Sequence, residues 1–145
     1  MPFPYRSLSG LALLAAACLP AATAELFPGP VEARVLRVID GDTFLAEALV
    51  WPGHSVTVSV RIRGIDAPEM RARCEAEKAA ARQARAALMR LLGEGPVRIT
   101  NIGGGKYYGR VLADVATAQG QDIAPAMLHL GMARAYEGKK RQAMC

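Results

Sequence analysis

A cation and two carboxylates stand within one short segment of the chain, residues 61–69, which reads Arg-Ile-Arg-Gly-Ile-Asp-Ala-Pro-Glu. The carboxylates are Asp66 and Glu69, and the first arginine is Arg61. Because proline holds the residue before it in an extended conformation, the carbonyl of Ala67 should point in a fixed direction. Such a set of groups can hold a metal ion or a phosphate, although a charged, solvated end of a hairpin would have the same composition.

A third carboxylate, Asp42, lies in an Asp-Gly-Asp turn between two predicted strands. If the strand ends meet, Asp42 and Asp66 could share one hard cation with the carbonyl of Ala67. Two carboxylates, a carbonyl and waters suit Ca²⁺, which takes about six to eight oxygen ligands in flexible geometry. The sequence therefore predicts a weak calcium site. His54 and His129 are isolated in the sequence, and no cluster of Cys and His indicates zinc.

A second arginine, Arg110, follows a glycine-rich loop and two tyrosines. Residues 103–106, Gly-Gly-Gly-Lys, do not match a phosphate-binding loop, because the spacing differs and Tyr107 stands where Ser or Thr is needed. Tyr107 and Tyr108 could simply pack beside a solvated arginine. Alternatively, the three residues could form a phosphate clamp flanked by rings that stack on bases.

The elements that position these residues are predicted from hydrophobic periodicity. Alternation from residue 55 to residue 63 predicts a strand with Arg61 on its polar face, and the phase changes at Gly64, as at a bulge or bend. Helical periodicity covers residues 75–92 and 123–130, with Asp122 as the N-cap of the second helix. The predicted strands are 31–39, 43–50, 55–63, 97–102 and 111–116.

The first three strands should form a meander, because tight turn signals join them. Five short strands with a long helix between the third and the fourth, and a short helix near the C-terminus, indicate a five-stranded OB-fold barrel. The fold class is α+β, mainly β. In the long helix, the basic residues should be solvated, and the predicted apolar face consists of Ala80, Ala84, Ala87, Leu88 and Leu91.

Residues 1–24 have the features of a secretory signal peptide: one basic residue, an apolar stretch and a small-residue exit. We expect cleavage after Ala24, which leaves residues 25–145 as one exported domain, periplasmic or secreted. A lipoprotein anchored at Cys18 ranks second, because Ala15 stands where a large aliphatic residue is usual. No later stretch is apolar enough to cross a membrane.

The whole chain has a formal net charge of +5, and loss of the leader, with its single basic residue, leaves +4. A basic exported domain suits a polyanion such as nucleic acid, although basic surfaces also occur without function. Of the three cysteines, Cys74 and Cys145 remain after cleavage, and an oxidising compartment favours a disulfide between them over two free thiols. Nothing in the sequence indicates a stable protein partner, and we expect a monomer.

Three separated motifs resemble the thermonuclease (staphylococcal-nuclease-like) family, in order and in spacing. They are Ile39–Thr43 (Ile-Asp-Gly-Asp-Thr), Arg61–Glu69 and Tyr108–Arg110 (Tyr-Gly-Arg). In addition, Leu128–Tyr136 resembles the family's last helix and the tyrosine after it. The resemblance implies a calcium-dependent phosphodiesterase that acts on DNA and RNA with little sequence preference.

By position, the resemblance makes Asp42 and Asp66 calcium ligands, together with the carbonyl of Ala67 at a place where the family often has threonine. Glu69 matches the general base or water-positioning carboxylate. Two arginines that grip the phosphate match Arg61 and Arg110.

The tyrosines that line the nucleotide pocket match Tyr108 and Tyr136. Two departures from the family concern Lys106-Tyr107, where an acidic and a basic residue are usual, and the short chain after Tyr136, which lacks the long C-terminal helix. The first affects contacts to a terminal phosphate, and the second affects stability.

Two other functions fit parts of the sequence. One is a non-catalytic OB-fold module that binds nucleic acid, since the family includes members that have lost the site. The other is a structural envelope domain without a nucleic-acid role. The presence of both arginines, the glutamate and both aspartates together favours the enzyme.

Overall fold

The computed structural model describes residue 1, residues 25–141 and residues 144–145. Apart from its first residue, the predicted signal peptide lies outside the described residues, and so does the alternative lipid anchor at Cys18. Within the described part, no helix is long and apolar enough to cross a membrane.

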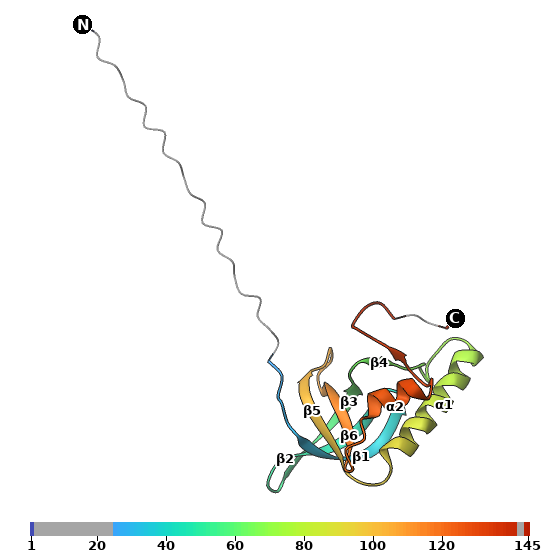
Figure 1. Ribbon diagram of the computed structural model, residues 1–145, viewed down its shortest axis with the longest axis horizontal. Helices are drawn as coiled ribbons and strands as arrows, with labels where there is room; N and C mark the ends of the chain where they lie inside the picture. Colours follow the sequence, from blue (N-terminus) through green and yellow to red (C-terminus); the bar gives the residue numbers. More distant parts are fainter. Residues whose placement is uncertain (2–24, 142–143) are drawn as a thin grey trace.

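Five strands close into a barrel (Figure 1). They are β1 (Val31–Asp40), β2 (Thr43–Trp51), β3 (His54–Ile62), β5 (Val97–Gly104) and β6 (Arg110–Thr117). Around the barrel the order is β1-β2-β3-β6-β5, and β5 pairs back with β1. The β3–β6 pair is parallel and the other pairs are antiparallel. This is the strand order of an OB-fold, so the predicted fold class is confirmed.

The interior of the barrel is filled by side chains that alternate along the strands, as period-two patterns predict. Two-residue turns, Gly41-Asp42 and Pro52-Gly53, join the first three strands into the predicted meander. Gly53 has a φ of 76°, which a residue with a side chain rarely adopts. The largest fully buried side chains of the five strands are Phe44, Val60, Ile62, Val97 and Ile99.

Helix α1 (Glu75–Leu92) packs against β1 with a stripe of small side chains. The predicted apolar face is confirmed at Ala84, Ala87 and Leu88, which are buried, and at Leu91, which is partly buried and packs against the core. It was wrong at Ala80, because the helix is turned so that positions 81, 84, 88 and 92 face the barrel. The basic face is not fully solvated, since Arg85 Nε donates a hydrogen bond to the carbonyl of Val38 at 3.0 Å. The buried residues of α1 are Glu77, Ala81, Ala84, Ala87, Leu88 and Leu92.

The close approach of α1 to the β1–β2 turn explains the glycine in that turn. A Cβ atom added at Gly41 would lie 2.6 Å from the Cβ of Ala84 and 2.9 Å from the Cβ of Ala67. Any side chain at this position would therefore push the turn away from the helix. The next residue is Asp42, so this packing places one of the predicted site carboxylates.

Helix α2 (Ile123–His129) covers one end of the barrel, where it contacts α1 and β6. Asp122 is the N-cap residue, as predicted, although its side chain makes no capping hydrogen bond. The helix buries Ile123 and Met127, and its C-terminus is followed by Gly131 at a φ of 68°.

A two-stranded sheet outside the barrel was not predicted. It pairs β4 (Ile65–Asp66) with β7 (Arg134–Ala135) in antiparallel register. Gly64, at a φ of 83°, makes the bend that the phase change indicates, and its carbonyl accepts a hydrogen bond from the N–H of Tyr136 at 2.9 Å. The pairing brings the chain after α2 beside the segment that carries the predicted site residues.

A disulfide joins Cys74 to Cys145, with a Cα–Cα distance of 6.3 Å. This is the pairing that the cysteine count predicts. Cys74 immediately precedes α1, so the bond holds the C-terminus of the chain beside the beginning of that helix (Figure 1).

Cys145→Ser is expected to lower the free energy of unfolding by about 2–4 kcal/mol, because the bond closes a loop of 71 residues in the unfolded chain. Urea unfolding of the oxidised protein measures this loss. Alkylation of denatured, unreduced wild-type protein followed by intact-mass measurement provides the control. Two alkylated cysteines in that sample would contradict the disulfide.

Candidate active site

A cleft of about 450 Å³ lies at one end of the barrel. The β1–β2 turn, the end of β3, the loop before β6 and the chain after β7, which we call the C-terminal tail, meet there. The structure brings most of the predicted site residues to its walls. Those that line it are Asp42, Arg61, Asp66, Glu69, Arg110 and Tyr136. Ala67 and Tyr108 do not line it.

Asp42 is fixed by hydrogen bonds and is almost fully buried. Its Oδ1 accepts a hydrogen bond from Thr43 Oγ1 at 2.7 Å, and its Oδ2 accepts one from the N–H of Ala67 at 2.8 Å. Its own carbonyl accepts the N–H of Ile62 at 2.8 Å. The carboxylate is therefore oriented before any ligand binds.

Arg61 brings the two aspartates together. Its Nη1 lies 3.0 Å from Asp42 Oδ2, and its Nη2 donates a hydrogen bond to Asp66 Oδ1 at 3.2 Å. Nη1 is buried and not aligned for a hydrogen bond, so its contact with Asp42 is an ionic one. The guanidinium carbon lies 5.5 Å from the centre of the Tyr136 ring, within cation–π range. Both carboxylates thus lie against the guanidinium of Arg61.

Arg110 enters the cleft from the first position of β6. Its Nη2 donates a hydrogen bond to Thr43 Oγ1 at 3.3 Å, whereas its buried Nε has no hydrogen-bond partner among the described residues. A Cβ atom at Gly105 would lie 2.5 Å from the carbonyl oxygen of Arg110, so the glycine-rich loop permits a close backbone approach there. The loop therefore positions an arginine instead of wrapping a phosphate with its own backbone.

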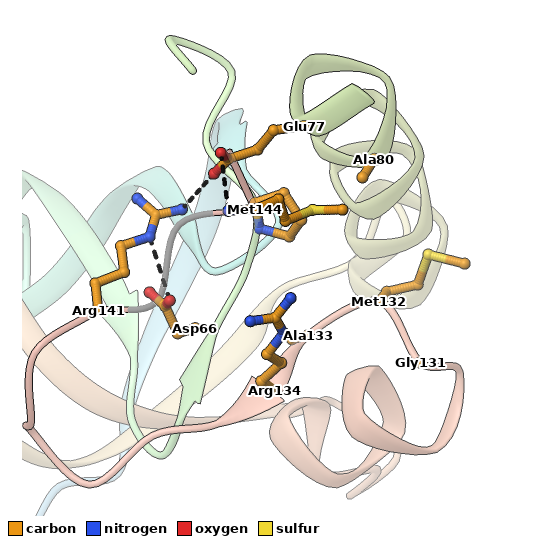
Figure 2. Close-up of a pocket in the computed structure, with 10 residues that line it drawn as sticks. Asp66, Glu77, Ala80, Gly131, Met132, Ala133, Arg134, Arg141 and Met144 are labelled. Atoms are coloured by element: carbon orange, nitrogen blue, oxygen red, sulfur yellow. Dashed lines mark hydrogen bonds and ion pairs between the residues drawn. The ribbon is translucent and has the colours of Figure 1, made fainter. Parts of the chain in front are cut away.

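The tail residue Arg141 was not predicted as a site residue, yet it makes the largest number of ionic contacts in the cleft. It forms an ion pair through Nη1 with Glu69 Oε1, and its Nη2 donates a hydrogen bond to the carbonyl of Ala67 at 2.8 Å. Its Nε lies 3.3 Å from Asp66 Oδ2, and its Nη2 lies 3.4 Å from Glu77 Oε1. Figure 2 shows the Arg141 side chain between Asp66 and Glu77.

Glu77 was also missed by the sequence analysis, although a signal for it exists. It occupies the same helical stripe as Ala81, Ala84 and Leu88, a place where a carboxylate is unusual. Its side chain is 6% exposed. Arg141 has no comparable signal, since it ends a run of basic residues in an irregular tail.

The tyrosines occupy different positions relative to the cleft. Tyr136 and Tyr107 line it, and Tyr108 is fully exposed outside it. Lys106 Nζ lies 5.6 Å from the centre of the Tyr107 ring. The first tyrosine of the loop therefore takes the place at the cleft that the family resemblance gives to the second.

The oxygen atoms of Asp42, Asp66 and the Ala67 carbonyl form a donor set that fits calcium. All three groups are hard oxygen ligands, and each lies against a guanidinium, so the surrounding structure already accommodates positive charge at this place. Among the described residues, the one place where three side chains of His, Cys, Asp or Glu lie close enough to share a metal ion is Cys74, Glu77 and Cys145. Its two sulfur atoms are bonded to each other and cannot act as thiolates.

A family model described as Staphylococcal nuclease homologue matches residues 59–144, more than half of the chain. The matched segment contains Arg61, Asp66, Glu69 and Arg110, and it begins after Asp42. No curated protein matches the chain.

Proposed function

Because the chain belongs to the Staphylococcal nuclease homologue family, we propose that it is a nuclease that uses calcium to hydrolyse phosphodiester bonds of DNA and RNA with little sequence preference. The observation that carries the proposal is the cleft in which an oxygen donor set and two arginines meet. A cation site and fixed donors for the phosphate oxygens both stabilise the negative charge that develops in the hydrolysis of a phosphodiester.

Asp42, Asp66 and the carbonyl of Ala67 would hold the calcium ion, which supplies positive charge for the phosphate when bound. Asp42 is held by Thr43 and by the N–H of Ala67, so its position does not depend on the metal. Alanine in place of the threonine that the family often has at position 67 should not weaken calcium binding, because the proposed ligand there is a backbone oxygen.

Glu69 is suited to orient the attacking water and to take its proton as the new bond to phosphorus forms. The bond between phosphorus and the leaving oxygen of the sugar then breaks, and this oxygen takes a proton from solvent water to become a hydroxyl group. The side chain of Glu69 is 55% exposed, so water can reach it from the open side of the cleft.

Arg61 and Arg110 would bind the phosphate oxygens. The unpaired Nε of Arg110 is a buried donor that an anion in the cleft could satisfy. The planar fork of arginine can donate twice to one phosphate. The exposed ring of Tyr108, with Tyr136 and Tyr107 at the cleft, would contact the nucleotide.

One observation favours the second candidate, a non-catalytic module that binds nucleic acid. Arg141 contacts Glu69 and the Ala67 carbonyl, two groups that the reaction needs free. The enzyme remains our proposal, because both arginines, both aspartates and the glutamate are present together. The same cleft would serve either function, so only a test for cleavage distinguishes them.

We also propose that the protein is exported and acts as a monomer. A disulfide between Cys74 and Cys145 is compatible with an oxidising compartment, such as the periplasm or the medium. The signal-like leader supports the same location.

The exported form, residues 25–145, is expected to degrade both plasmid DNA and RNA in Ca²⁺ and to lose this activity in EGTA. Mg²⁺ added with EGTA should restore less than about one tenth of the rate, because it demands tight octahedral geometry and dehydrates reluctantly. Gel electrophoresis of the products measures cleavage, and a mobility shift measures binding. A shift without cleavage in Ca²⁺ would support the non-catalytic module, and full activity in Mg²⁺ would contradict the calcium assignment.

A further inference from the structure

The guanidinium of Arg141 lies where the proposed calcium site and the proposed base meet. Its three nitrogens contact Asp66, the Ala67 carbonyl and Glu69. Arg61 also contacts Asp66, but it reaches neither the carbonyl nor Glu69 in the described structure. Arg141 is thus the one cation among the described residues that faces both a metal ligand and the base.

The position of Arg141 is supported by a buried carboxylate on α1. The described hydrogen-bonding partners of Glu77 all come from the tail: Arg141 Nη2 at 3.4 Å from Oε1, and the N–H of Met144 at 3.3 Å from Oε2. The sulfur of Cys145 lies 3.4 Å from Oε2, but in a disulfide it has no proton to donate. A buried carboxylate without a partner is strongly unfavourable. Glu77 therefore makes a docking place for this tail.

The disulfide keeps the tail at this docking place. Cys145 follows Arg141 by four residues and is bonded to Cys74 just before α1. The disulfide thus raises the effective concentration of Arg141 near its carboxylate partners, which favours their contact without any new interaction. Three features of different kinds, an ion-pair cluster, a buried carboxylate and a covalent tether, thus converge on one arginine.

We propose that Arg141 is an intramolecular cation that competes with calcium for Asp66 and the Ala67 carbonyl and covers Glu69, so that the disulfide-tethered tail restrains the active site. The inference rests on the proposed calcium-dependent nuclease function. Calcium and a guanidinium repel each other and need the same oxygen atoms. Calcium binding must therefore displace Arg141 from these groups, and the displacement releases the Glu69 carboxylate from its ion pair.

Calorimetric titration of Ca²⁺ into the exported full-length chain tests this competition without any measurement of activity. Arg141→Gln removes the competing charge and should lower the Kd for Ca²⁺ about tenfold or more. In a partly buried site, both the attraction of the guanidinium to the carboxylates and its repulsion of Ca²⁺ are strong at contact distance. Lys140→Gln is the matched control, because it removes the same charge from the neighbouring exposed residue. It should change the Kd by less than about twofold, as a screened surface charge does.

Hydrogen exchange of the wild-type tail provides the second measurement. Saturating Ca²⁺ should increase exchange in a peptide that covers residues 137–145 and leave exchange in α1 unchanged. Cys145→Ser, which cuts the tether, should lower the Kd for Ca²⁺ about threefold through loss of effective concentration. If that variant does not fold, the wild-type exchange experiment still decides between release and retention of the tail.

The outcomes separate this inference from the proposed function. If both wild type and Arg141→Gln cleave nucleic acid and bind Ca²⁺ with the same Kd, the proposed competition is overturned and the proposed nuclease function stands. Weaker calcium binding in Arg141→Gln would also overturn it, and would make Arg141 a supporting residue of the metal site. Absence of both calcium binding and cleavage in every variant would overturn the proposed function itself.

Discussion

Asp66→Asn is expected to abolish nuclease activity, by about 10²-fold or more, while the protein stays folded. The substitution keeps the size of the side chain and removes one of the two negative charges that the proposed calcium site needs. Among the described residues, the Asp66 side chain accepts no hydrogen bond from a backbone group, and its partners are the guanidinium groups of Arg61 and Arg141. Calorimetry should show a Kd for Ca²⁺ raised about tenfold or more, and circular dichroism should show an unchanged spectrum.

Asp114→Asn is the matched control for this prediction. Asp114 also pairs with an arginine, Arg63 at 3.2 Å, but it lies on β6 outside the cleft. Its neutralisation should change activity by less than about twofold, as for other exposed ion pairs. Asp42→Asn should inactivate the enzyme as well, with a small loss of stability because Asp42 accepts the N–H of Ala67. Near-normal cleavage by Asp66→Asn in Ca²⁺ would show that the metal is held elsewhere.

The barrel could be predicted because its signals are local. Phe44 and Ala46 alternate with partly exposed residues along β2, and Gly41 and Gly53 mark the turns where the chain must reverse. The convergence of Asp42 and Asp66 followed from the meander, since antiparallel neighbours bring their ends together. These features depend on residues close in sequence or on the pairing of adjacent strands.

The remainder depends on contacts between distant parts of the chain. β4 and β7 have two residues each, too few to produce an alternating pattern, and they pair only because α2 turns the chain back toward Gly64. Arg141 is 64 residues from Glu77 and 74 residues from Ala67. No periodicity connects such positions, and the cysteines alone indicated where the tail would go.

The charges of the cleft explain how so many ionisable groups can lie together before a ligand is bound. Arg61 forms ion pairs with Asp42 and Asp66, and Arg141 forms one with Glu69, so these opposite charges offset one another. In this arrangement the proposed metal ligands and the proposed base are paired with cations of the same chain. In the proposed reaction, calcium would replace the arginines at the carboxylates, and the phosphate would bind the arginine of β3. The charged groups that this reaction would use are therefore already present in the cleft as ion pairs.

Arg110 is the exception, because its buried Nε has no partner in the described structure and its Nη2 donates only to Thr43. Arg110→Lys is accordingly expected to lower kcat by about 10²-fold or more, since an ammonium group lacks the planar fork whose separate nitrogens can bind Thr43 and a phosphate at the same time. The charge stays the same, and no proposed metal ligand is touched. The Kd for Ca²⁺ should therefore stay within about twofold of the wild-type value, as expected at constant charge.

Arg98→Lys provides the control for this substitution, because Arg98 is exposed on β5 and does not line the cleft. It should leave both kcat and calcium binding unchanged. Loss of turnover with intact calcium binding in Arg110→Lys would show that phosphate binding and metal binding depend on different residues. Asp66→Asn cannot show this, because it is expected to weaken calcium binding and activity together. A folded Arg110→Lys protein with a near-normal rate would mean that the unpaired nitrogen of Arg110 does not meet the phosphate.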